Sequence, residues 1–175
     1  IGKFIRRLTK KEGGSTSEGI TQDKIAILSI NRNQYSETFI QSHIRFLPNA
    51  VIYSDGYFPT SFSLDRGETW GILDVSSSSE TVLVQSWKDN NVKVVLAEYG
   101  PAGVEVMNAC STANIPLVVH FHGFDAYRDD VLKSYGDRYK ELFQIASKII
   151  VVSKDMKAQL LSLGCPKEKL EQITY

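Results

Sequence analysis

Short apolar runs and longer amphipathic stretches alternate along the chain after residue 23. The apolar runs cover residues 24–30, 50–53, 92–97, 117–121 and 148–152, and each predicts a β-strand. Leu117 to Val119 lack in–out alternation, as expected of a strand that is covered on both faces of a sheet. The pattern therefore predicts five strands, and it places the one at 117–121 inside the protein.

Amphipathic helices are predicted between these strands. One spans residues 39–47 and ends before Pro48, and another, which Ser153 caps, ends at Gly164. Residues 81–88, 106–113 and 139–146 show the same spacing, whereas residues 57–79 show no period and are expected to be irregular. Alternating strands and helices predict an α/β fold, a Rossmann-like three-layer sandwich with a parallel β-sheet.

The first 23 residues differ from the rest. Residues 1–11 carry five positive and no negative side chains, and their apolar residues share one helical face. Such a helix can lie on an anionic membrane surface, although the pattern is also that of a terminal helix packed on its own domain or of a frayed arm. Residues 12–19 indicate a flexible linker. We therefore expect a basic arm and linker at 1–23 and one domain at 24–175.

Composition narrows the function classes. With 20 basic and 20 acidic side chains the formal net charge is zero, so nothing indicates nucleic-acid binding. The two cysteines lie in separate helical segments, which suits a reduced, cytoplasmic protein, and no apolar run reaches membrane-spanning length. Because the chain begins at Ile1, we expect a fragment or a processed protein.

Candidate chemistry follows the predicted strands. In open α/β sheets ligands bind outside the carboxyl ends of the strands, so polar residues there are site candidates. A helix that starts just after the first strand also favours an anion at its N-terminus. The candidates are Ser36, Glu37 and Thr38; Glu98, Tyr99 and Gly100; His120, His122, Gly123 and Asp125; and Ser153.

Several common sites are excluded. The chain has no glycine-rich dinucleotide motif, no phosphate-binding P-loop and no nucleophile elbow, and no cofactor is expected. His120 and His122 have no third ligand near them in the sequence, so a metal site is not expected either. On spacing alone, a histidine at a strand end could simply satisfy a loop carbonyl.

The segment His-Phe-His-Gly-Phe-Asp at 120–125, with Ile-Ile-Val-Val-Ser at 149–153, resembles glycosyltransferase family 4. The resemblance covers about residues 24–175 and implies the N-terminal half of the two-domain GT-B architecture of retaining enzymes. In that family a C-terminal domain holds the nucleotide-sugar donor through two glutamates eight positions apart. No glutamates here have that spacing, so the resemblance implies an acceptor-side domain that is inactive alone.

The resemblance also suggests roles for the candidates. His122 matches the family histidine that faces the donor sugar and phosphate, which implies a supporting catalytic role. Residues 36–38 match the first loop, where many relatives carry two glycines instead, and residues 98–100 match the loop after the third predicted strand. His120, Gly123 and Asp125 are expected to orient the loop, and Ser153 begins the segment that leads toward the second domain.

Implied partners are a nucleotide-sugar donor and a sugar or lipid-linked acceptor, in polysaccharide or glycolipid synthesis. A cytoplasmic protein, peripheral at the membrane through residues 1–11, would fit this role. Two alternatives stay open. One is a GT-B-shaped nucleotide-sugar epimerase, and the other is a non-catalytic α/β module that binds a sugar or phosphorylated ligand.

Overall fold

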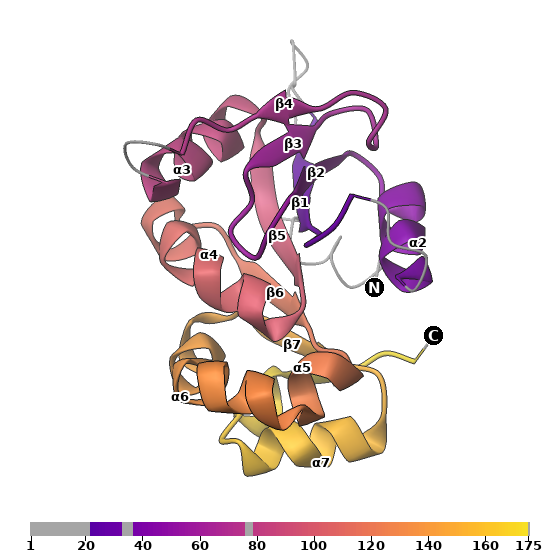
Figure 1. Ribbon diagram of the computed structural model, residues 1–175, viewed down its shortest axis with the longest axis vertical. Coiled ribbons are helices and arrows are strands. Elements are labelled where there is room, and N and C mark those ends of the chain that lie inside the picture. The colour runs from indigo at the N-terminus through magenta and orange to yellow at the C-terminus, as the bar shows by residue number, and fades with distance from the viewer. Residues whose placement is uncertain (1–21, 33–36, 76–78, 175) are drawn as a thin grey trace, which may run out of the picture.

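The computed structural model of the chain describes residues 22–32, 37–75 and 79–174. Within these residues one eight-stranded sheet has the order β4-β3-β2-β1-β5-β6-β7-β8 (Figure 1). The predicted arm at 1–11 and linker at 12–19 lie outside the described residues. The strands are β1 (Lys24–Leu28), β2 (Ala50–Ser54), β3 (Ser61–Ser63), β4 (Gly71–Ile72), β5 (Val92–Glu98), β6 (Leu117–His120), β7 (Lys148–Val151) and β8 (Leu170–Gln172).

The sheet is largely parallel. Every neighbouring pair in the part of the sheet ordered β2-β1-β5-β6-β7-β8 is parallel, whereas β3 pairs antiparallel with both β2 and β4. The predicted α/β class is thus confirmed. The prediction that residues 57–79 are irregular was wrong for β3 and β4, because strands of three and two residues are too short to show a period. A further strand, β8, precedes the end of the chain.

Helices cover both faces of the sheet (Figure 1). Apolar side chains of α2 pack on one face, and those of α3, α4 and α6 pack on the other. Among the described residues, no helix is both long enough and apolar enough to cross a bilayer. The helices are α2 (Thr38–Phe46), α3 (Ser79–Asp89), α4 (Gly100–Ala113), α5 (Gly123–Tyr127), α6 (Asp129–Ile145) and α7 (Lys154–Ser162), with a 3-10 turn at Lys167–Lys169.

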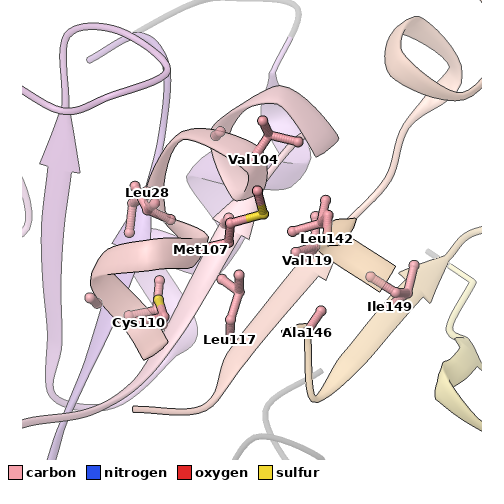
Figure 2. Close-up of a cluster of buried hydrophobic side chains, with 14 of the residues drawn as sticks. Leu28, Val104, Met107, Cys110, Leu117, Val119, Leu142, Ala146 and Ile149 are labelled. Atoms are coloured by element: carbon pink, nitrogen blue, oxygen red, sulfur yellow. The ribbon is translucent and has the colours of Figure 1, made fainter. Parts of the chain in front are cut away.

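Side-chain alternation along the strands divides the core in two. In β1, Ala26 and Leu28 join the larger cluster, while Ile25 and Ile27 join the smaller cluster beneath α2. Figure 2 shows side chains of α4 lying over the strands of the larger cluster. The labelled members are Leu28, Val104, Met107, Cys110, Leu117, Val119, Leu142, Ala146 and Ile149.

The same alternation positions polar side chains. Val94 and Leu96 of β5 face α2, and so does Val118 of β6. With a period of two, Glu98 and His120 at the ends of these strands must point to the α2 face as well. The register pairs Glu98 directly with His120. The strand order also reverses at β1, between β2 and β5, and such a switch point is where open α/β sheets bind ligands.

Candidate active site at the carboxyl edge of the sheet

A buried carboxylate lies at the centre of the candidate site. Glu98 is fully buried, and each of the chain's three histidines places a ring nitrogen near its carboxylate. His43 Nδ1 lies 2.5 Å from Oε1, while His120 Nδ1 and His122 Nε2 lie 3.0 and 3.2 Å from Oε2. We call these four residues the Glu98 cluster.

The Glu98 carboxylate is ionised in this cluster. Burial raises the pKa of Glu98, but hydrogen bonds from His120, His122 and His43 outweigh it and hold that pKa well below its usual range. An ionised carboxylate only accepts hydrogen bonds, so each imidazole nitrogen that faces it acts as the donor. The cluster therefore sets which nitrogen of each histidine carries the proton.

His122 is enclosed by aromatic rings. Its ring stacks on Phe39 of α2 with centroids 4.1 Å apart and lies 4.8 Å from the ring of Tyr99. The residue is only 6% exposed. Burial lowers the pKa of His122, and the hydrogen bond with Glu98 opposes that shift. The side chain is held firmly, and only a small part of it can meet a ligand.

Asp125 connects the start of α4 to the start of α5 by hydrogen bonds. Its carboxylate accepts hydrogen bonds from the backbone N–H of Gly100 at 2.5 Å and of His122 at 2.7 Å. Burial raises the pKa of Asp125 to about 7, although both N–H groups act in the opposite direction. Through these contacts the start of α4 and the start of α5 are fixed relative to each other.

Tyr99 connects the site to the start of α2. Its hydroxyl donates to Glu37 Oε1 over 3.2 Å, and Asn31 Nδ2 donates to the same oxygen over 3.3 Å. Burial and the nearby Glu37 raise the pKa of Tyr99, so its hydroxyl keeps the proton that it donates. The backbone of Tyr99 has φ 81° and ψ 143°, a conformation that non-glycine residues rarely adopt. Such strain is typical of functional loops.

Gly100 is required by packing. A Cβ atom at this position would lie 2.6 Å from Phe121 Cε1 and 2.8 Å from the Tyr139 hydroxyl, closer than real Cβ contacts. Phe121 and Tyr139 are both fully buried, so neither can move aside easily. Glycine lets α4 start directly against the strand ends and brings its first N–H to Asp125.

Comparison with known proteins identifies the family. The family model of Glycosyltransferase Family 4 matches residues 74–174, which is more than half of the 175 residues. The chain belongs to glycosyltransferase family 4. This agrees with the resemblance seen in residues 120–125 and 149–153.

Two relatives extend the family 4 assignment. WcaL of Salmonella typhimurium (strain LT2), a candidate colanic acid biosynthesis glycosyltransferase, is 32% identical over 117 residues, or 61% of this chain and 29% of its own length. WcaL of Escherichia coli (strain K12) is 32% identical over 79 residues, or 44% of this chain and 20% of its own. The family 4 chain thus spans less than a third of either relative.

Solved structures of Anabaena Alr3699/HepE share the fold. The complex with UDP-glucose gives a TM-score of 0.62 at 19% identity, and the complex with UDP and glucose gives 0.60 at 16%. Each match covers 87% of this chain and 44% of the HepE chain. At this identity the likeness concerns the fold, and it agrees with the predicted half of a GT-B architecture.

Most site residues predicted from the sequence of this family 4 chain do lie together. His120 and His122 share one face as strand alternation requires, and Glu98, Tyr99 and Glu37 join them through the contacts above. Four predicted residues do not join these contacts. Thr38 is the exposed first residue of α2, and Gly123 has open space where a Cβ would be. Ser153 caps α7 and accepts a hydrogen bond from Met156 N over 3.0 Å, while Ser36 lies outside the described residues.

His43 was missed by sequence reasoning. It lies on α2, 55 residues before Glu98, and was counted only among the positions of an amphipathic helix. A signal did exist, because a histidine on the face of a helix that packs against a sheet needs a polar partner there. The sequence alone could not say that this partner was Glu98.

Proposed function

We propose that this chain is the acceptor-side domain of a glycosyltransferase that transfers a sugar from a nucleotide-sugar with retained configuration. Its acceptor would be a sugar or a lipid-linked sugar in polysaccharide or glycolipid synthesis. Membership of family 4 and the names of the WcaL relatives support this proposal. So does the fold shared with a protein crystallised with UDP-glucose. The observation that carries it is the Glu98 cluster, which lies beside the switch point of the sheet.

The chain's own residues suit such a reaction. Cleavage of a bond between sugar and diphosphate needs stabilisation of the departing charge, and the positive end of the helix dipole at the start of α2 favours an anion. The Glu98 carboxylate holds the ring of His122, and Asp125 holds its backbone. Because Phe39 covers one face of the ring, a donor would meet His122 at its edge. His122 would then support the leaving group and would not act as a nucleophile.

A second part of the proposal concerns the donor. We infer that most of the nucleotide-sugar is held by a domain outside this chain and that the chain alone transfers no sugar. The support is that the chain spans only 29% of one WcaL relative and 44% of HepE. Calorimetric titration of the isolated chain with UDP-sugars checks this point. We expect no binding in the low-micromolar range, and such binding would show that the donor site had been misplaced.

The proposal also extends to location and to His122. We expect a cytoplasmic protein that contacts the membrane peripherally through residues 1–11.

In the whole enzyme encoded by the gene, His122→Ala should lower kcat by about 100-fold or more, the size of effect seen when one positioned donor is removed. His120→Ala is the comparison, because His120 belongs to the same cluster but is fully buried. It should mainly lower Tm.

The outcome for His122 separates a catalytic role from a structural one. Turnover near the wild-type rate in His122→Ala, together with a lower Tm, would leave the residue a purely structural role. The same measurement tests the non-catalytic alternative, because a binding module would release no nucleotide from any nucleotide-sugar.

A further inference from the structure

Part of the Glu98 cluster has the composition of a metal site. Ligand atoms of His43, Glu98 and His120 all lie within 4.8 Å of one another. They come from α2, β5 and β6, three elements that are far apart in the sequence. Glu98 and His120 are fully buried, and the His43 side chain is 13% exposed. Only the folded chain brings these three groups together.

The donor atoms suit a borderline divalent ion. Zinc and its neighbours prefer imidazole nitrogen and carboxylate oxygen, with bonds of about 2.0–2.2 Å. Four such ligands around one ion lie about 3.3 Å apart, by the geometry of a tetrahedron with those bond lengths. His120 Nδ1 lies 3.0 Å from Oε2 of Glu98, which is close to that separation, whereas His43 Nδ1 lies 2.5 Å from the other oxygen, Oε1. The His43 ring must therefore shift to make room for an ion. His43 is the least buried of the three and can make that movement.

The charge of the cluster points the same way. A fully buried carboxylate is costly unless an opposite charge or several donors accompany it. A divalent cation would supply that charge. Each imidazole that binds it would lose the proton that faces Glu98, to its other ring nitrogen or to water, and form a metal–nitrogen bond in its place. The cluster would then join α2 to the middle of the sheet through one ion.

We propose that His43, Glu98 and His120 form a three-ligand binding site for one divalent transition-metal ion of the zinc type. His122 Nε2, at 3.2 Å from Glu98 Oε2, lies beside this site as a neighbour. The ion fastens α2 to β5 and β6, and it shares Glu98 with the contact that holds the ring of His122. The experiment measures ion binding and Tm, so its failure is distinguishable from failure of the glycosyltransferase function.

The test uses the full chain after chelator treatment and removal of the chelator. Zn²⁺ at about 100 times its Kd should raise Tm by about 5–10 °C, from the linkage relation and the usual dependence of Tm on stability. Calorimetry should give one ion per chain. Co²⁺ should show the intense visible absorption of a low-symmetry site with nitrogen and oxygen ligands.

Two variants locate the ion. His43→Ala should weaken Zn²⁺ binding at least tenfold and abolish the Tm shift, and because His43 is partly exposed this variant should still fold. Cys165→Ser is the matched control, because Cys165 is buried but lies in another part of the fold, and it should bind as the wild type does. Absence of a Tm shift and of Co²⁺ absorption in the wild type would overturn the proposal and leave a purely hydrogen-bonded cluster. Equal binding by His43→Ala and the wild type would overturn it as well.

Discussion

Alanine at position 100 should destabilise the protein, although glycine is usually a poor helix residue. The new Cβ would lie 2.6 and 2.7 Å from two carbons of Phe121 and 2.8 Å from the Tyr139 hydroxyl. Overpacking of this kind in a rigid core costs about 1–3 kcal/mol. For a chain of this length that corresponds to a fall in Tm of about 2–12 °C.

Gly136 provides the matched control for Gly100→Ala. It lies in the interior of α6, and apart from its chain neighbours and the nearby helix backbone no described atom lies within 4 Å of the place where its Cβ would be. Alanine there should gain about 0.5–1 kcal/mol, because glycine costs that much inside a helix. The same substitution should thus lower Tm at position 100 and raise it at position 136. Thermal unfolding followed by circular dichroism measures both, and two shifts of the same sign would refute the packing argument.

Three further predictions concern the site and the arm. Tyr99→Phe removes one hydrogen bond from the buried Glu37 and should lower the free energy of unfolding by about 1–3 kcal/mol, measured by urea unfolding. An unchanged urea midpoint would mean that water replaces the hydroxyl. The pKa of Asp125 in the folded chain is raised to about 7, so the contribution of Asp125 to the free energy of unfolding is largest at low pH and is lost as pH rises toward 7. The free energy of unfolding of the wild type, measured relative to that of Asp125→Asn, should therefore fall by about 1.4 kcal/mol per pH unit between pH 5 and 7. A difference between the two proteins that does not change with pH would argue against the raised pKa. Removal of residues 1–11 should reduce sedimentation with anionic vesicles, moderate salt should have the same effect, and equal sedimentation of both forms would disprove a membrane-binding arm.

Strand periodicity predicted much of the site. The order of strands and loops was enough to expect that the polar residues after the third and fourth predicted strands would share one edge of the sheet, and Glu98, His120 and His122 do meet there. The cap at Ser153 was also predicted correctly, because a serine before an amphipathic run is a local signal. Such features depend on residues close together in the sequence, or on a rule that holds for every parallel sheet.

The parts that were missed depend on long-range packing. Nothing near His43 in the sequence indicates that α2 lies against the end of β5 and brings this histidine to Glu98. The short strands β3 and β4 form because β2 offers them an edge, and their own residues show no strand period. The five-residue helix α5 was taken for a loop, since so short a helix leaves no apolar repeat.

The reversal of strand order at β1 has a consequence for synthesis on the ribosome. β1 pairs with β2 soon after both emerge, but its second partner is β5, and the register pair Ala26 and Val95 is 95 − 26 = 69 residues apart. At about 5–20 residues per second, β5 follows β1 by roughly 3–14 s. During that interval the strand that will become the centre of the sheet has an open hydrogen-bonding edge. The nascent chain is therefore most prone to incorrect strand pairing after β1 and β2 have emerged and just before β5 appears. Binding by a chaperone would protect it most at that stage.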